Sequence, residues 1–504
     1  MFNKILKQFT KYLLFPQNSL KQRAISSGVW LGFSRMLNKI LLLVRAIILA
    51  RMLSPKDFGL FGISLAVLSL LQTFSQPGTG EALIQKKDDI APYLDAAWTI
   101  KIIRGISLAL FLYFCAPFAS RFFAEPQIIT LIYIIAASLI IGGIGNQGII
   151  YFAKDLNFRK AFIYEISGVI TDFCVSLILV FILHNALALA YGYLAGIFTL
   201  TVVSYFIHPY RPKFKIDLPK IKELTRFGRW VWLYTIFNYI LSDGISFFIG
   251  KVLGVISLGL YQMALKISAL AAGEISAVFS SVGFSFYSKL QDDASKLKEA
   301  YIKTLKINNL LIFPICVFLY GMSPLIVHVL LGEKWQGIVW LIRIFSLLGL
   351  FTSLSTINNT FFKSMGNPNL TAKFQIIKLI LISSIIYFVT VKFGLIGVSI
   401  LILIVNIAIS PFECAIIFKK LGLRINIILK IILFPLANSI ITITVIFLIN
   451  KWLVVHINII SFIFLTFLSV ILYLFTTFIS DQIFHFGIKR LFNKNYLLNL
   501  FVTK

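Results

Sequence analysis

The sequence has 504 residues, of which 59% are hydrophobic and only 13% are charged. Soluble domains carry about 25% charged residues, so this composition excludes an ordinary soluble enzyme. The formal net charge of +28 would suggest nucleic acid in a soluble chain. Here the cations stand mostly between long apolar stretches, so membrane topology explains them and we expect no nucleic-acid partner.

Residues 1–25 differ from the apolar stretches that follow. Their apolar side chains recur at helical spacing with lysines between them: Phe2, Ile5, Leu6, Phe9, Lys4, Lys7 and Lys11. Such a pattern favours a short amphipathic helix on the cytoplasmic membrane surface rather than a cleavable signal peptide. A disordered basic tail is the alternative.

Apolar stretches long enough to cross a bilayer begin near residue 26 and recur almost to residue 480. About 20 apolar residues cross the hydrocarbon core, so we predict an all-α integral membrane protein with about 14 transmembrane helices. The predicted spans are 26–50, 57–80, 96–118, 127–149, 161–183, 186–208, 230–251, 256–286, 307–330, 336–360, 374–391, 394–418, 429–450 and 457–480.

The basic residues predict the orientation of these spans. They concentrate in alternate connections, most densely in residues 209–229, and are nearly missing from the short connections on the other side. Cytoplasmic connections carry the excess of Lys and Arg, so this asymmetry predicts that both termini are cytoplasmic.

The chain also repeats itself. Arg51-Met52-Leu53 has a counterpart in Lys251-Val252-Leu253, and Gly59-Leu60-Phe61 in Gly259-Leu260-Tyr261, at an offset of 200 residues (251 − 51). Six spans in each repeat imply two parallel lobes with a cavity between them. We therefore predict an N-lobe (26–208), a basic linker (209–229), a C-lobe (230–418), and a C-terminal part (419–504) with two further helices and a cytoplasmic tail.

Several cations fall inside the predicted spans, where a charge costs at least about 2.5–3.5 kcal/mol. One explanation is snorkelling or structural ion pairing. The other is a hydrated cavity with a positive wall, which would attract phosphate or pyrophosphate. The candidate substrate-binding cations are Arg35, Lys39, Arg45, Lys101, Arg104, Lys266, Arg343 and Lys378.

The acids inside the spans are fewer. Asp172, Asp243 and Glu274 could couple transport to H⁺ or Na⁺, or could pair with the cations; Glu165 and Glu413 are further acids of this kind. We find no phosphate-binding Gly-rich loop, no zinc-ligand spacing and no catalytic motif, so we expect no cofactor, no metal site and no enzyme. The four cysteines lie in apolar spans without metal-type spacing.

Three connecting segments carry a family resemblance: residues 50–61 (ARMLSPKDFGLF), residues 82–88 (ALIQKKD) and residues 154–160 (KDLNFRK). Their order and spacing resemble the Wzx-type flippases of the multidrug/oligosaccharidyl-lipid/polysaccharide superfamily. The branch that they resemble includes colanic-acid and teichuronic-acid exporters. The resemblance covers roughly residues 20–420 and is strongest in the first 170.

This resemblance implies two six-helix lobes, alternating access and a bacterial inner-membrane location. It implies a polyprenyl-pyrophosphate-linked oligosaccharide as substrate, such as an O-antigen or surface-polysaccharide repeat unit, moved to the periplasmic leaflet. Glycosyltransferases and a polymerase of the same pathway would be its partners. The alternatives are a cation-coupled drug or metabolite antiporter of the same fold, or a membrane polysaccharide polymerase or ligase.

Overall fold

The computed structural model describes residues 20–75, 89–155, 157–217, 243–452 and 458–487, with a few isolated positions between these ranges. Side chains before Met36 are outside the described part. Three predicted segments therefore lie mainly outside the described residues. They are the amphipathic segment 1–25, the seventh span (230–251) and the second half of the basic linker (209–229). The chain divides into two compact units, Met1–Gly259 and Leu260–Lys504.

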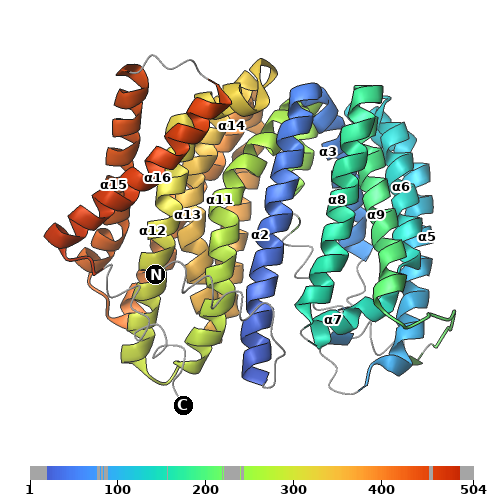
Figure 1. The fold of residues 1–504 in the computed structure, drawn as a ribbon, viewed down its shortest axis with the longest axis horizontal. Coiled ribbons are helices and arrows are strands. Elements are labelled where there is room, and N and C mark those ends of the chain that lie inside the picture. Colours follow the sequence, from blue (N-terminus) through green and yellow to red (C-terminus); the bar gives the residue numbers. More distant parts are fainter. Residues whose placement is uncertain are drawn as a thin grey trace. The chain divides into compact units, whose positions relative to one another are not determined.

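Unit 1 consists of apolar helices joined by short connections (Figure 1). Its principal elements are α2 (Leu20–Met52), α3 (Pro55–Ser75), α5 (Ala91–Phe123), α6 (Ile128–Ile144), α7 (Ile150–Lys154), α8 (Phe158–Leu183) and α9 (Leu187–Ile207). Helix α8 packs along α9 and against α2, while α6 packs between α5 and α9. The first helical turn of α11 (Gly254–Lys289) belongs to unit 1 and the rest of α11 to unit 2.

The α8–α9 contact is close because it is lined by glycine. A Cβ on Gly196 of α9 would lie 2.9 Å from the carbonyl oxygen of Gly168 of α8. A Cβ on Gly192 would lie 1.8 Å from Oγ of Ser176. Small residues let helices in a membrane approach closely enough to gain dispersion energy, since lipid offers no hydrophobic drive for association.

Unit 2 is also helical throughout its described part (Figure 1). After α11 it contains α12 (Ala294–Ile326), a π-helical turn η2 (Val327–Leu331), a 3₁₀ turn η3 (Glu333–Ile338), α13 (Val339–Ser364), α14 (Pro368–Leu421), α15 (Ile425–Trp452) and α16 (Ile459–Phe484). Helix α13 packs between α12 and α14, and α15 packs between α12 and α16.

Helix α14 is two spans rather than one. Gly394 has φ 61° and ψ −149°, a conformation that other residues rarely adopt, and it divides α14 into two arms, 368–393 and 395–421. An arm of 26 residues is about 39 Å long at 1.5 Å per residue, enough to cross a bilayer core of about 30 Å. The arms correspond to the predicted spans 374–391 and 394–418.

Nine of the described helices are long and apolar enough to cross a membrane when α14 is counted once, and the bent pair of α6 with the following turns makes a tenth candidate. No strand occurs in the described ranges. Unpaired backbone groups are costly in lipid, so spans of this kind are helical. The predicted class, an all-α multi-pass membrane protein, is confirmed.

Candidate functional site

Arg45 of α2 is held by an acid of α8. Its Nη2 lies 2.7 Å from Oδ1 of Asp172 and donates a 2.9 Å hydrogen bond to Oγ of Ser176. The side chains of Arg45 and Asp172 are only 11% and 12% exposed. Gly192 leaves the room that this group needs, because a Cβ there would lie 2.8 Å from Oδ1 of Asp172. The sequence left two explanations for Arg45, a structural ion pair or a contact with substrate. In this conformation Arg45 forms a structural ion pair, and its partner is Asp172, the candidate for ion coupling.

Arg35 and Lys39 lie one turn apart on α2, and their contact with substrate stays a prediction. Lys39 is exposed, whereas the side chain of Arg35 lies outside the described part of the chain. Beside Lys39, Asn38 donates a 3.2 Å hydrogen bond from Nδ2 to Oε2 of Glu165 on α8. A carboxylate of α8 therefore stands near this turn of α2.

Lys101 of α5 lies where α6 ends. The chain bends by 73° between α6 and the turns that follow, which frees the last carbonyl groups of α6. Lys101 Nζ donates to the carbonyl oxygen of Gly145 at 3.2 Å. Trp98 Nε1 and the Tyr205 hydroxyl both donate to the carbonyl oxygen of Ile144, at 2.9 and 2.7 Å. The ammonium of Lys101 thus compensates the negative end of a broken helix.

Arg104 has the same kind of contact at the end of α3. Its Nη2 donates to the carbonyl oxygen of Gln72 at 2.8 Å, and its Nε donates to Oγ of Ser75 at 3.1 Å. Lys101 and Arg104 therefore both bind the ends of neighbouring helices. This observation accounts for their presence in an apolar span without a carboxylate.

The remaining predicted site residues are spread over unit 2 and the end of unit 1. Arg343 of α13 lies 4.7 Å from the ring centre of Trp340 and donates from Nε to Oγ of Ser323 at 3.1 Å. Lys266 is exposed on α11, and Asp243 is half-buried in the helical residues 243–252. Glu274 lies on α11, but its side chain is outside the described part.

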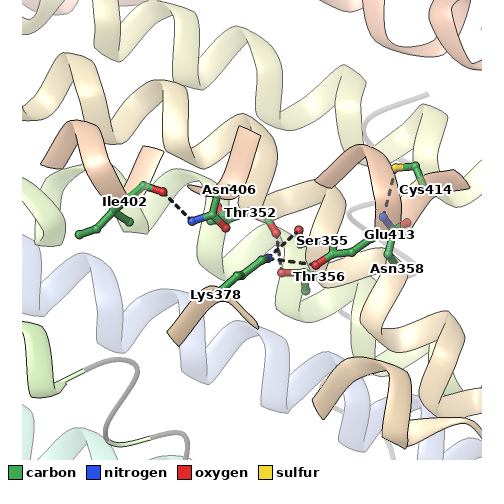
Figure 2. Close-up of polar contacts among 9 residues, drawn as sticks. All are labelled: Thr352, Ser355, Thr356, Asn358, Lys378, Ile402, Asn406, Glu413 and Cys414. Carbon is green, nitrogen blue, oxygen red and sulfur yellow. Dashed lines mark hydrogen bonds and ion pairs between the residues drawn. The ribbon is translucent and has the colours of Figure 1, made fainter. Parts of the chain in front are cut away.

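Lys378 and Glu413 form the most deeply buried ion pair of the described residues (Figure 2). Lys378 lies on the first arm of α14 and Glu413 on the second, and their side chains are 7% and 0% exposed. Nζ of Lys378 lies 3.0 Å from Oε1 of Glu413 and 3.5 Å from Oγ of Ser355 on α13. Structural pairing applies to Lys378 as it does to Arg45.

An apolar groove runs between α12, α15 and α16. Its volume is about 790 Å³, and its walls include Leu311, Pro314, Phe318, Ile443, Val470 and Leu474. The hydroxyl groups in its walls are already bonded to helix carbonyls. Tyr473, for example, donates to Leu310 at 2.9 Å, and Ser439 donates to Pro435 at 2.6 Å. The groove therefore suits a hydrocarbon chain and has little to offer a sugar or a charged group.

The segment after α9 is bound along the start of α5. The Tyr210 hydroxyl donates to Oδ1 of Asp95, which also accepts from the backbone N–H of Lys213 at 3.0 Å. The N–H of Lys215 donates to Oγ1 of Thr99 at 2.9 Å. Burial, and then the hydrogen bond to Asp95, raises the pKa of the Tyr210 phenol. The predicted basic linker thus begins as an ordered segment whose amides are bound to α5.

Sequence reasoning overlooked three of these features: the partner of Lys378, the carbonyl contacts of α5 and the apolar groove. A signal for the first was present. Lys378 lies 16 residues before Gly394 (394 − 378) and Glu413 lies 19 after it (413 − 394), so a hairpin centred on Gly394 brings them close. No comparable signal marks the groove, because its walls are residues that any lipid-facing helix contains.

No group of three metal-ligating side chains occurs among the described residues. What the described structure offers is a set of long apolar helices, cations paired inside the apolar spans and a groove for a hydrocarbon chain. These features define a multi-pass membrane protein that is built to interact with lipid. Residues 48–340 match the family of polysaccharide biosynthesis proteins, and the chain belongs to that family.

Two curated relatives have names that fit this family. The lipopolysaccharide biosynthesis protein WzxC of Escherichia coli (strain K12) is 25% identical over 78% of this chain and 81% of its own length. The teichuronic acid biosynthesis protein TuaB of Bacillus subtilis (strain 168) is 24% identical over 70% of this chain and 73% of its own. The resemblance to Wzx-type exporters is confirmed.

Among solved structures, the chain is similar to a lipid II flippase, MurJ, in an inward closed conformation. The TM-score is 0.70, with 16% identity, and the match covers 89% of this chain and 98% of that one. At this identity the likeness concerns the fold. The predicted fold of a flippase-type transporter is confirmed.

Proposed function

We propose that this protein moves a polyprenyl-pyrophosphate-linked oligosaccharide from the cytoplasmic to the periplasmic leaflet of a bacterial inner membrane. The observation that carries the proposal is the family match over residues 48–340, on a chain with the fold of a lipid II flippase. Both termini would be cytoplasmic, and glycosyltransferases and a polymerase of the same pathway would supply and consume the substrate.

The apolar groove supports the lipid part of this substrate class. A prenyl chain has no hydrogen-bonding groups, and the polar groups in the groove walls are already bonded to helix carbonyls, as those of Tyr473 and Ser439 are. The chain could therefore lie against α12, α15 and α16 while no polar group of the wall is left unpaired.

Arg35 and Lys39 are our candidates for the pyrophosphate contact. Arg45 and Lys378 are paired with acids in this conformation, and Lys101 and Arg104 bind carbonyl groups of helix ends. For Lys266 and Arg343 a substrate contact likewise remains a proposal. Arginine binds phosphate oxygens in pairs and lysine acts as a point charge, so α2 has both kinds of contact within one turn.

Export is favoured over the two alternatives. A drug antiporter for organic cations needs an acidic and aromatic cavity, whereas here the cations outnumber the acids inside the spans. A polymerase or ligase needs a catalytic group, whereas the fold of this chain is similar to that of a lipid II flippase and the relatives described above include WzxC. The protein is therefore a transporter rather than an enzyme.

A deletion strain tests the proposal. Loss of the protein should accumulate lipid-linked oligosaccharide in the cytoplasmic leaflet and remove the surface polymer, and the wild-type gene should restore both. The double variant Arg35→Ala/Lys39→Ala should insert normally and fail to restore export, while Lys419→Ala/Lys420→Ala, which removes two exposed cations at the end of α14, should restore it. Normal export from the Arg35/Lys39 variant would refute the pyrophosphate contact, and unchanged lipid-linked oligosaccharide in the deletion strain would refute the function.

A further inference from the structure

Glu413 is a carboxylate with unusually few partners for its burial. The residue is 0% exposed, and within the part of the chain that the structure describes neither carboxylate oxygen receives a hydrogen bond from any residue other than Lys378. The one charged contact that the described ranges provide for it is Lys378, 3.0 Å away. Buried carboxylates in proteins are normally bound by several donors. The charge of Glu413 therefore depends on a single side chain.

The groups around this pair add no second charge (Figure 2). Helix α13 contributes Ser355, Asn358 and the hydroxyl groups of Thr352 and Thr356, which donate to backbone carbonyls. The titratable neighbours are Cys414, which accepts a 3.2 Å hydrogen bond from Nδ2 of Asn358, and Tyr301 of α12, which donates to Oδ1 of the same asparagine at 2.7 Å. Both are neutral in their protonated forms. Among the described residues, Lys378 is therefore the only cation in contact with Glu413.

The pair lies far from the point where the two arms of α14 meet. Lys378 is 16 residues before Gly394 and Glu413 is 19 residues after it. At 1.5 Å per residue these separations are about 24 and 28 Å along the two arms. A contact so far from Gly394 has a large effect on the distance between the ends of the arms.

We propose that Glu413 is a proton-binding site and that binding of a proton releases the two arms of α14 from each other. The added proton converts the carboxylate into a neutral carboxylic acid, and Lys378 keeps its own proton. The ammonium then has lost its counter-charge in a buried position, which is costly. It lowers its free energy by moving towards water, and this movement separates the arms.

This inference rests on the proposed transport function, since a transporter without a nucleotide site needs another source of energy. A proton that binds and leaves as α14 opens and closes links the helix movement to the proton gradient. Asp172 has a different environment, because it contacts Arg45 and also accepts a hydrogen bond from Oγ of Ser176 at 3.1 Å. Asp172 is therefore a matched buried acid for which we expect no proton uptake.

Infrared difference spectra of the purified protein in lipid vesicles, recorded between low and neutral pH without substrate, test proton binding. The wild type should show the carbonyl band of a buried protonated carboxyl group. Glu413→Gln should lack that band, and the control Asp172→Asn should retain it. In Lys378→Met, where the cation is missing, the band should persist to higher pH than in the wild type. The same titrating bands in Glu413→Gln and wild type would overturn the proton site.

Hydrogen exchange measured by mass spectrometry tests the release of the arms. Glu413→Gln imitates the protonated side chain, so at neutral pH we expect faster exchange than in the wild type near both ends of α14, with α8 and α9 unchanged. Identical exchange in the two proteins would overturn the link to α14. Should Glu413→Gln fail to fold, Lys378→Met carries both measurements. None of these readouts requires transport, so a failed export assay with a positive infrared result would refute the function and leave the proton site standing.

Discussion

Arg45 and Asp172 connect α2 to α8 through a 2.7 Å ion pair from which water is largely excluded. Removing one partner of a buried pair leaves the other charge unpaired, at a cost of about 3–5 kcal/mol. We therefore expect Asp172→Leu to lower the free energy of unfolding by this amount, and Arg45→Met/Asp172→Leu to recover most of it. Unfolding of the purified protein by added SDS measures both changes.

The double variant also separates the two roles that we considered for Arg45. Arg45→Met/Asp172→Leu should be nearly as stable as the wild type, so any loss of export cannot come from misfolding. Normal export would assign Arg45 to structure alone, and lost export would add a contact with substrate. A single variant as stable as the wild type would contradict the structural role of the pair.

Gly192 is the second test of this region. A methyl group there would lie 1.8 Å from Oγ of Ser176 and 2.8 Å from Oδ1 of Asp172. Overpacking of this kind costs about 1–3 kcal/mol, so Gly192→Ala should unfold at lower SDS fractions than the wild type. Gly273 on α11 has no atom within 4 Å of the same position. Gly273→Ala is the control and should be neutral or more stable by up to about 1 kcal/mol.

The environment of Tyr210 predicts that the stability of the folded protein depends on pH. Its raised pKa means that the folded protein favours the neutral phenol. The contribution of Tyr210 is therefore fully present below the ordinary tyrosine pKa of about 10 and is lost as the pH rises above it. Thermal unfolding from pH 8 to 11 should show a loss of stability in the wild type that exceeds the loss in Tyr210→Phe. Equal losses in the two proteins would show that the Asp95 contact does not contribute.

The apolar groove is tested by filling it. Val470 lines the groove, and Phe467 lies on the same helix but not in the groove wall. Val470→Trp should reduce export severely while the protein still inserts, because the indole occupies space that the prenyl chain needs. Phe467→Trp adds bulk of the same kind outside the groove and should export normally. Equal export by both variants would mean that the groove holds no part of the substrate.

Much of the fold could be predicted from the apolar stretches alone. The two arms of α14 are an example, since Gly394 falls between two stretches that are each long enough to cross a bilayer. The bend after α6 was not predicted, although the glycines and polar residues of 142–148 (GGIGNQG) interrupt the hydrophobic run inside the predicted span 127–149. Here tertiary contacts decide the outcome, since Lys101, Trp98 and Tyr205 bind the carbonyl groups that the bend exposes.

The candidate site was harder to predict than the fold. Charge inside an apolar span marks a residue as costly, and the sequence identified Arg45 and Lys378 for that reason. Their partners depend on which helix faces lie together, and that information is not contained in the spacing within one helix. Only at a hairpin such as α14, where two residues are nearly equidistant from the turn, does the order of residues along the chain indicate the pair.

Transport itself is the central claim, and the direct measurement uses the purified protein in lipid vesicles that contain a polyprenyl-pyrophosphate-linked oligosaccharide. A membrane-impermeant glycosidase then reports how much oligosaccharide faces outward over time. The account predicts that the protected fraction becomes accessible with the wild type and stays protected with Arg35→Ala/Lys39→Ala or with empty vesicles. If the protected fraction stays inaccessible to the glycosidase in the presence of folded wild-type protein, with and without a proton gradient, the proposed transport function is contradicted.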